Sequence, residues 1–300
     1  MNYLITGGSG FIGSHLVENL LKSGHSVINI DNFDDFYDYR IKIRNTLDST
    51  GHTSSFKFTN KVDDINVVIN TSKSENYKLY YQDIRDKDGL KNIIENHKID
   101  FIIHLAALAG VRPSIENPLD YEAVNIRGTQ NLWELCKEFG IHKFIYASSS
   151  SVYGNSDKVP FSETDNVDRP ISPYAATKKA GELLGHVYHH LYNIDMIHLR
   201  FFTVYGPRQR PDLAIHKFTK LILDDDEIPF YGNGSTARDY TYIDDIIDGI
   251  LKSVLYLESR AKVFEIINLG ENEVVTLSEM LSELEKALGK SANKKILPMQ

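Results

Sequence analysis

The first residues of the chain constrain its fold more than any other stretch. A short apolar run, Tyr3 to Thr6, leads into glycines at positions 7, 10 and 13, and an amphipathic stretch over 11–22 follows. In such a strand, turn and helix, Gly7 permits the tight turn, Gly10 lets the backbone approach a phosphate, and Gly13 lets helix and strand pack closely. Because the N–H groups at the start of the helix are free to bind an anion, this unit predicts a phosphate-binding turn.

A carboxylate after the next predicted strand makes the expectation more specific. The strand runs over 26–30, and Asp31 ends it, 18 residues after Gly13. A carboxylate at this position can accept hydrogen bonds from both hydroxyl groups of an adenosine ribose, and it would repel a 2′-phosphate. The two features together predict a dinucleotide site that prefers NAD to NADP.

Apolar runs and amphipathic stretches continue to alternate along the chain. Further strands are predicted at 77–81, 101–105, 143–147 and 194–201, with helices at 86–96, 121–139 and 174–191 between and after them. This alternation predicts an α/β fold with a Rossmann-type doubly wound parallel sheet over residues 1–200. Residues 201–300 are expected to form mostly a smaller mixed α/β lobe that binds substrate, with about 240–268 returning to the Rossmann domain.

One segment breaks this rhythm. Residues 44–76 are polar and rich in Ser, Thr, Asn and Asp, with two alternating patches at 56–58 and 67–69. We expect a surface insertion there, either a solvated loop or a hairpin, because insertions usually lie on the surface.

The composition limits which binding partners and which cellular compartment are expected for this chain. The net charge of −8 argues against nucleic acid or an anionic membrane as the main partner, and no apolar run approaches the roughly 20 residues that span a bilayer. The single cysteine, Cys136, excludes an intrachain disulfide and suits a reducing compartment. The first residues do not resemble a signal peptide. We therefore expect a cytoplasmic protein, and no metal site.

Two groups of side chains are candidates for a catalytic site. Tyr174 and Lys178 lie four residues apart in a predicted helix, so their side chains share a face. A lysine ammonium and an oxidised nicotinamide nearby would both favour the phenolate, which makes Tyr174 a candidate general base. A serine run at 148–151 follows the strand at 143–147, where ligands bind in parallel sheets. The alternative for this run is a loop that satisfies its own backbone.

These motifs together resemble the extended short-chain dehydrogenase/reductases that act on nucleotide sugars, within the NAD-dependent epimerase/dehydratase family. The resemblance covers nearly the whole chain and rests on Gly7/Gly10/Gly13, Asp31, 104–109, Ser149, Tyr174/Lys178 and 200–206. It implies that Ser149, four residues before the tyrosine of the Val-Tyr-Gly turn at 152–154, is catalytic together with Tyr174 and Lys178. It implies NAD contacts, besides the glycines and Asp31, from Phe11, Ile12, Asn32, Asp83, Ile84, Leu105, Ala106, Ala107, Tyr174 and Lys178.

Within this family the chain is most similar to UDP-glucuronate 4-epimerases, through 32–38, 109–112 and 200–214. Dehydratases need an acid/base carboxylate pair where this chain has Ser150 and Ser151, and galactose-type epimerases usually carry asparagine at Thr203. The resemblance implies that Tyr174 takes the proton of the sugar 4-hydroxyl while Ser149 binds the same oxygen. It also implies a 4-keto sugar that turns in the pocket, and an NAD that stays bound.

Three alternatives stay open. The first is a UDP-glucose or UDP-N-acetylglucosamine 4-epimerase. The second is a UDP-glucuronate decarboxylase, because a 4-keto uronate is a β-keto acid that loses CO₂ easily. The third is a non-catalytic dinucleotide sensor, although such proteins typically lack the Tyr/Lys pair.

A UDP-linked uronate needs cations to bind its carboxylate and its diphosphate. A guanidinium can bind a carboxylate through two hydrogen bonds. The expected substrate contacts are Arg112, Ser149, Ser150, Ser151, Thr203, Arg208, Arg210, Lys217 and Arg238. Arg210 is the expected carboxylate contact, and Arg238 matches the family's phosphate-binding arginine. For each arginine the alternative is a surface salt bridge.

The resemblance also implies an assembly and a setting. It implies a homodimer through a four-helix contact, for which 121–139 and 174–191 are the candidate helices, unless their apolar faces cover the sheet instead. Relatives usually continue beyond the position of Gln300 with a short segment that helps to close the nucleotide pocket. The resemblance further implies a role in supplying precursors for capsule or surface polysaccharide.

Overall fold

A seven-stranded parallel sheet forms the larger part of the computed structural model, which describes residues 1–52 and 56–298. In sheet order, the strands are β10 (Phe264–Leu269), β6 (Asp195–Phe201), β5 (Lys143–Ser149), β4 (Phe101–His104), β1 (Asn2–Thr6), β2 (Ser26–Asp31) and β3 (Tyr77–Tyr81). The chain order reverses between β1 and β4, both parallel to their neighbours. The predicted doubly wound sheet is confirmed, and its ligand crevice is expected beyond the ends of β1 and β4.

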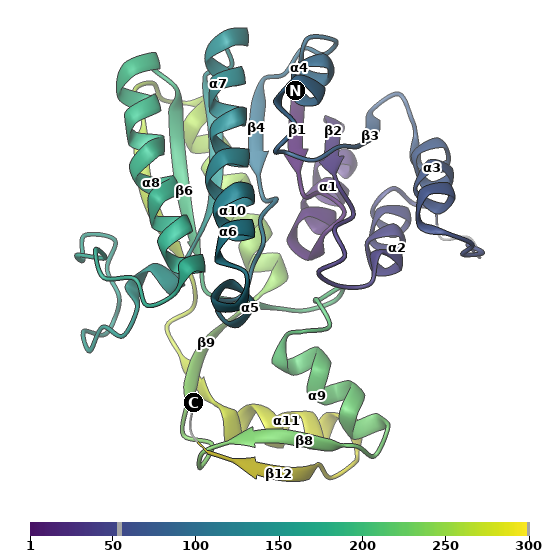
Figure 1. The fold of residues 1–300 in the computed structure, drawn as a ribbon, viewed down its shortest axis with the longest axis vertical. Helices are drawn as coiled ribbons and strands as arrows, with labels where there is room; N and C mark the ends of the chain where they lie inside the picture. The colour runs from purple at the N-terminus through teal and green to yellow at the C-terminus, as the bar shows by residue number, and fades with distance from the viewer. Residues whose placement is uncertain (53–55, 299–300) are drawn as a thin grey trace.

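Helices cover both faces of the sheet (Figure 1), and alternate residues of the strands enter two separate cores, one on each face. Tyr3 and Ile5 of β1 pack with α1 (Phe11–Lys22) and α10 (Ile243–Glu258). Leu4, between them, packs with α4 (Lys87–Ile94) and α7 (Thr129–Phe139). This is the pattern of a sheet buried on both faces, whose strands are apolar throughout.

The remaining helices of this part begin close to the crevice. The predicted helix over 121–139 is interrupted, since α6 (Pro118–Glu122) and a π-helical segment η1 (Ala123–Gly128) precede α7. The short α5 (Val111–Glu116) comes directly before α6, and a 3-10 turn η2 (Ser150–Tyr153) follows β5. The predicted helix over 174–191 is α8 (Pro173–Tyr192), and its N-cap Ser172 accepts a hydrogen bond from the Ala175 N–H.

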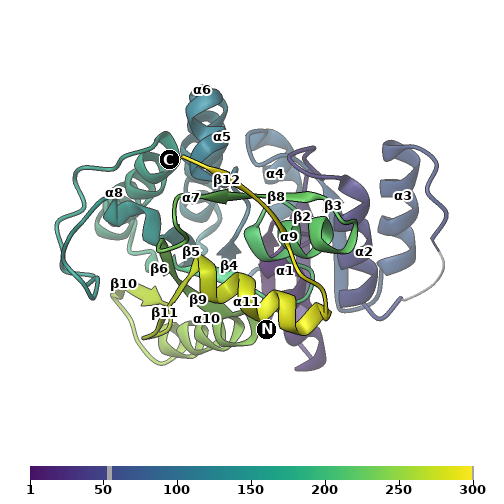
Figure 2. The ribbon, with the colours of Figure 1, turned by 90° about the horizontal axis from the view of Figure 1, so that it is seen from below.

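A smaller mixed lobe lies beyond one end of the large sheet (Figures 1 and 2). Its helices α9 (Ala214–Leu223) and α11 (Leu277–Leu288) share a core with β8 (Glu227–Tyr231), which pairs with β12 (Asn293–Leu297). A three-stranded sheet of β7 (Thr203–Tyr205), β9 (Ala237–Tyr242) and β11 (Val274–Thr276) adjoins it. A capping box between Thr276 and Glu279 begins α11. None of the described helices combines the length and apolarity that a bilayer crossing requires.

The expectation of a loop or hairpin over 44–76 is wrong. The segment contributes to two helices, α2 (Tyr39–Ser49) and α3 (Lys61–Ser72), apart from 53–55, which lie outside the described residues. Ile65 and Val68, three residues apart, are fully buried in the core that also contains α1. Asn60 caps α3 by accepting a hydrogen bond from the Asp63 N–H. The helical spacing of two apolar residues, rather than the alternation at 67–69, therefore determined the local structure.

Two neighbouring valines of α3 test whether this segment is part of the core. Val68→Ala removes two methyl groups from a side chain that is 0% exposed, and we expect a loss of about 1.5–3 kcal/mol in the free energy of unfolding. Val67, which is 50% exposed, is the matched control, and Val67→Ala should change it by less than about 0.5 kcal/mol. Urea denaturation measures both, and equal losses would mean that α3 does not pack as described.

Candidate active site

The glycine-rich turn is built for a close approach to another group. Gly7 has a φ of +74°, and its N–H donates to the Ile30 carbonyl at 2.8 Å. A Cβ on Gly13 would lie 2.1 Å from the Gly7 oxygen, so only glycine lets α1 pack this closely. Gly10 is the N-cap of α1 and has no side chain to cap it. The first-turn N–H groups of α1 therefore face the crevice without a capping side chain, as an anion site requires.

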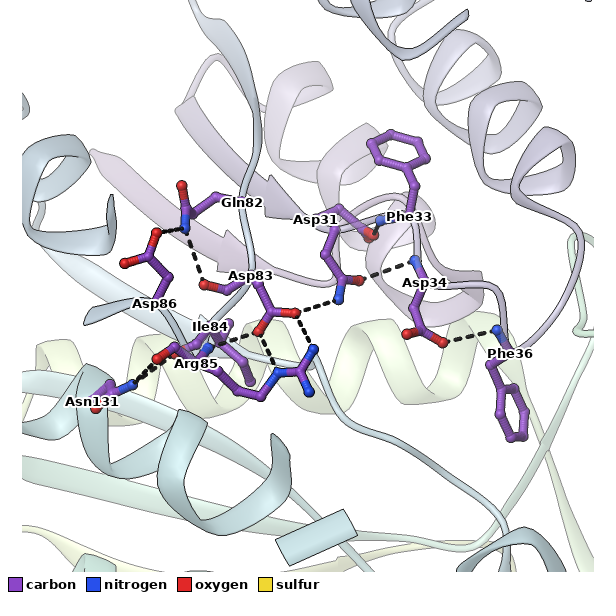
Figure 3. A network of polar contacts seen from close by, with 11 residues as sticks. Asp31, Phe33, Asp34, Phe36, Gln82, Asp83, Ile84, Arg85, Asp86 and Asn131 are labelled. Carbon is purple, nitrogen blue, oxygen red and sulfur yellow. Dashed lines mark hydrogen bonds and ion pairs between the residues drawn. The ribbon is translucent and has the colours of Figure 1, made fainter. Parts of the chain in front are cut away.

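Asp31 at the end of β2 is held by the backbone around it. One carboxylate oxygen accepts from the Phe33 N–H at 2.8 Å and the other from the Ser9 N–H at 3.1 Å. Figure 3 shows the contact with Phe33 and the neighbouring polar groups. The carboxylate is 6% exposed and borders the same cavity as the glycine turn. Its orientation is thus set before any ligand binds, and lone pairs remain for further donors.

A polar network continues from Asp31 toward β3 and α4 (Figure 3). Asn32 donates to Asp83 at 2.9 Å, and Arg85 binds the same carboxylate through Nη2 at 2.7 Å. Asp83 borders a separate polar depression, beside the cavity that the glycine turn and Asp31 border. Asn32 borders both. Of the expected cofactor contacts in this region, Ile84 borders the main cavity and Asp83 does not.

The main cavity has a volume of about 380 Å³ and runs from the glycine turn to α8. It brings together residues from both expected groups, cofactor and substrate. The expected site residues on its wall are Gly7, Gly10, Phe11, Ile12, Gly13, Asp31, Asn32, Ile84, Leu105, Ala106, Ala107, Ser149, Ser150, Ser151, Tyr174, Lys178, Thr203 and Arg210.

Tyr174, Lys178 and Ser149 meet at one end of this cavity. The Lys178 ammonium donates to the Ala147 carbonyl at 2.7 Å and lies 5.9 Å from the centroid of the Tyr174 ring. The Ser149 hydroxyl donates to the Ser151 hydroxyl at 3.1 Å. Burial raises the pKa of Tyr174, while the nearby Ser149 hydroxyl and the charge of Arg210 oppose the rise. Burial also lowers the pKa of Lys178 to about 7. The trio can therefore exchange a proton with a bound hydroxyl group.

A buried ion pair between α8 and β6 supports the turn that carries Ser149. Arg200 of β6 binds Glu182 of α8 through Nε and Nη2, both at 2.8 Å, and Arg200 and Glu182 are 1% and 2% exposed. The Ser148 hydroxyl donates to Glu182 at 2.7 Å, and Arg200 Nη1 donates to the Tyr153 hydroxyl at 2.8 Å. The network ties α8 to both ends of the turn that carries Ser149.

The cationic candidates separate into one inside the cavity and four outside it. Arg210 borders the cavity, pairs with Asp212 at 2.9 Å and lies over the Phe36 ring. Arg112 is exposed and lies over the Tyr231 ring, and Arg208 pairs with Glu18 at 2.8 Å. Lys217 and Arg238 are exposed. In this structure only Arg210 of the five is within the cavity that holds Tyr174.

Sequence reasoning missed Lys42 of α2. This lysine is 7% exposed and borders the cavity. It donates to the Asp34 carbonyl at 2.8 Å and lies 4.9 Å from the centroid of the Tyr37 ring. Within the described ranges no carboxylate pairs with it, so it can offer charge to an anionic ligand. Lys42 lies between the stretch 32–38, which was used only for the family resemblance, and the expected insertion at 44–76, so no expectation covered it.

The buried Lys178 predicts a pH dependence of stability. Its pKa is about 7 in the folded protein and near 10.5 when exposed, so between these values the unfolded chain binds a proton that the folded chain does not. Stability of the protein alone should therefore rise with pH over this window, by up to about 1.4 kcal/mol per pH unit from this group. Lys178→Met should flatten the slope.

Urea denaturation at about pH 7.5 and about pH 9.5 measures this slope. Lys73→Met, which removes an exposed lysine at the end of α3, is the control and should keep the wild-type slope. Equal slopes for wild type and Lys178→Met would contradict the burial of an uncharged Lys178.

Known proteins resemble this chain in sequence and structure. A model of the NAD dependent epimerase/dehydratase family matches residues 3–270. A UDP-glucuronate 4-epimerase of Thermodesulfobacterium geofontis is 44% identical over 296 residues, which are 98% of this chain and 83% of that protein. The UDP-glucuronic acid 4-epimerase of Bacillus cereus, solved with UDP-glucuronic acid and NAD, superposes with a TM-score of 0.84 at 38% identity.

The Bacillus cereus match covers 100% of this chain and 87% of that one. A UDP-glucose 4-epimerase from Thermotoga maritima, solved with UDP-glucose, superposes with a TM-score of 0.81 at 30% identity, over 100% of this chain and 86% of its own. Both the family model and the relatives span the sheet and the cavity that its strand ends form. The chain therefore belongs to the NAD dependent epimerase/dehydratase family.

Proposed function

We propose that this protein is an NAD-dependent UDP-sugar 4-epimerase that interconverts UDP-glucuronate and UDP-galacturonate. One observation carries the proposal: a single cavity is bordered by the phosphate-binding turn, by Ser149, Tyr174 and Lys178, and by the Arg210 guanidinium. Relatives named UDP-glucuronate 4-epimerase, 44% and 36% identical, support the same reaction.

The residues at the crevice fit NAD. Gly7 packs so closely against the Ala106 backbone that a Cβ would lie 2.8 Å from its nitrogen, which keeps the turn tight, and a pyrophosphate would lie in the cavity that Gly7 and Gly10 border. The uncapped start of α1 faces this place, and the Asp31 carboxylate can bind the adenosine ribose. Lys42 adds a positive charge toward the phosphates. When bound, NAD would supply a hydride acceptor and a positive nicotinamide ring.

The proton chemistry falls to Ser149 and Tyr174. Tyr174 accepts the proton of the sugar 4-hydroxyl, and Ser149 holds the same oxygen by a hydrogen bond. A phenolate in this buried place needs nearby positive charge, which Lys178 provides on the same face of α8. After the 4-keto sugar turns in the pocket, Tyr174 returns the proton, so the residues end as they began.

Arg210 and Thr203 support a uronate over a neutral hexose. Arg210 donates to Asp212 through Nε and Nη2, so a uronate carboxylate would bind its free Nη1 or take the place of Asp212, whereas a hydroxymethyl group offers the guanidinium no negative charge. Thr203 borders the cavity and can donate a further hydrogen bond. A carboxylate held at two points is also fixed in orientation, which favours epimerisation over loss of CO₂ from the 4-keto sugar.

We also propose a homodimer through α7 and α8, in a cytoplasmic protein that serves surface polysaccharide synthesis. Leu183, Val187 and Leu191 follow one another at four-residue spacing on α8 and are 58%, 46% and 57% exposed. Such a stripe on one helix face is typical of a helix–helix contact between subunits. The unpaired Cys136 is buried, as suits a reducing compartment.

Proton NMR of the purified protein with UDP-glucuronate and no added cofactor tests the function. We expect UDP-galacturonate to appear without loss of CO₂, from NAD that copurifies. Tyr174→Phe should abolish turnover by removing the base, and it should still bind NAD because the glycine turn is intact. A UDP-pentose product would assign a decarboxylase instead, and turnover by Tyr174→Phe would overturn the role of Tyr174.

Arg210→Gln tests the uronate preference. Losing a charge-assisted contact of about 1.5–3 kcal/mol should weaken binding of UDP-glucuronate roughly 10- to 100-fold. Affinity for UDP-glucose should change much less, so calorimetry with both ligands separates recognition of the carboxylate from damage to the fold. Arg260→Gln, which removes an exposed arginine that lies on Tyr256, is the control for lost charge. An equal loss for both sugars would contradict the assignment.

A further inference from the structure

The Lys178 ammonium is buried with little to stabilise its charge. Lys178 is 4% exposed, and its ammonium donates a hydrogen bond to the Ala147 carbonyl. The groups that face it are Tyr174 on its own helix, His104 on β4 and Tyr146 on β5. Burial lowers the pKa of His104 to about 3, so this ring is neutral. No carboxylate in the described ranges pairs with Lys178, because Glu182, one turn further along α8, is bound to Arg200.

The Tyr146 ring is the remaining group that can stabilise the charge of Lys178. It precedes Ala147 on β5, so one strand offers Lys178 both a carbonyl and a ring face. The ammonium lies over this ring, 5.1 Å from its centroid. Tyr146 is 1% exposed, and its hydroxyl has no hydrogen-bond partner in the described structure, so the contact with Lys178 uses the ring and not the hydroxyl.

Helix α8 is shaped to admit this ring. Gly181 lies three residues after Lys178, and therefore on the same face of the helix. A Cβ at Gly181 would lie 2.3 Å from the Tyr146 hydroxyl oxygen. The absence of a side chain there lets the ring lie flat beneath the ammonium. A position that only glycine can occupy thus serves the contact between Tyr146 and Lys178.

We propose that the face of the Tyr146 ring stabilises the Lys178 ammonium and thereby favours the phenolate form of Tyr174, which makes Tyr146 a positioning residue for the proposed epimerisation. The attraction between a cation and an aromatic face is strongest where water is excluded. Burial opposes the charge on Lys178, and the ring offsets part of that cost. This inference rests on the proposed function, because it assigns Tyr146 a role in the same proton transfer.

Fluorination of the ring tests the proposal without changing its shape. The series is Tyr146→Phe, followed by 4-fluorophenylalanine and 3,4,5-trifluorophenylalanine at the same position. The ring face becomes less negative at each step, while packing is nearly constant. The pKa of Lys178, followed by NMR of the protein with ¹³C-labelled lysine side chains and assigned with Lys178→Met, should fall stepwise. We expect a total fall of about 0.5–1 unit from Phe to the trifluoro variant.

The pH dependence of turnover gives the second reading. As Lys178 loses its charge more readily, the acidic limb of kcat, set by Tyr174, should move to higher pH through the same series. Phe144→Leu, a packing change two residues earlier on the same face of β5, should lower stability. It should leave the pKa of Lys178 and the acidic limb of kcat unchanged. An unchanged pKa of Lys178 across the series would overturn the proposal.

The NMR titration does not depend on turnover. An inactive wild-type protein would therefore refute the proposed function while the effect of the ring on Lys178 is still measured. Conversely, an active epimerase with a constant Lys178 pKa would refute only the role of Tyr146.

Discussion

The buried ion pair between Glu182 and Arg200 is the contact on which the rest of the site depends. It locks α8 onto the ends of β5 and β6, and the Ser148 hydroxyl binds the same carboxylate. Breaking one side of such a pair typically costs about 3–5 kcal/mol, because the other charge stays buried. Once α8 is fixed there, Lys178 must lie under Ala147 and Tyr174 beside Ser149. The reactive geometry is thus a consequence of how one helix packs.

The same burial that assembles these groups also sets their chemistry. It raises the pKa of Tyr174 and lowers that of Lys178, which alone would leave both uncharged. Positive charge or an aromatic face near the pair moves the balance toward phenolate and ammonium. Arg210 at the cavity wall and the Tyr146 ring act in this direction, and a bound nicotinamide would do the same. The phenolate form of Tyr174 is therefore expected to be most populated when the site is filled.

Much of this arrangement could be predicted from the sequence, because it depends on local patterns. Glycine spacing and strand periodicity gave the turn at Gly7 and the sheet, and the i, i+4 spacing gave the shared face of Tyr174 and Lys178. The arginines were harder, since four of the five cations expected near the substrate lie outside the cavity. Their placement depends on tertiary partners such as Glu18 for Arg208. Helix α3 was missed because two buried apolar residues in a polar segment carry little periodic signal. Lys42 was missed because its place at the cavity depends on how α2 packs, which no local pattern shows.

In the proposed reaction, one cavity removes hydrogen from C4 of the sugar and returns it to the opposite face. UDP-glucuronate labelled with deuterium at C4, incubated in ordinary water, tests this most directly. We expect UDP-galacturonate that retains the deuterium at C4 in full, because the hydrogen never reaches solvent. Product that has exchanged its C4 label with water would contradict it.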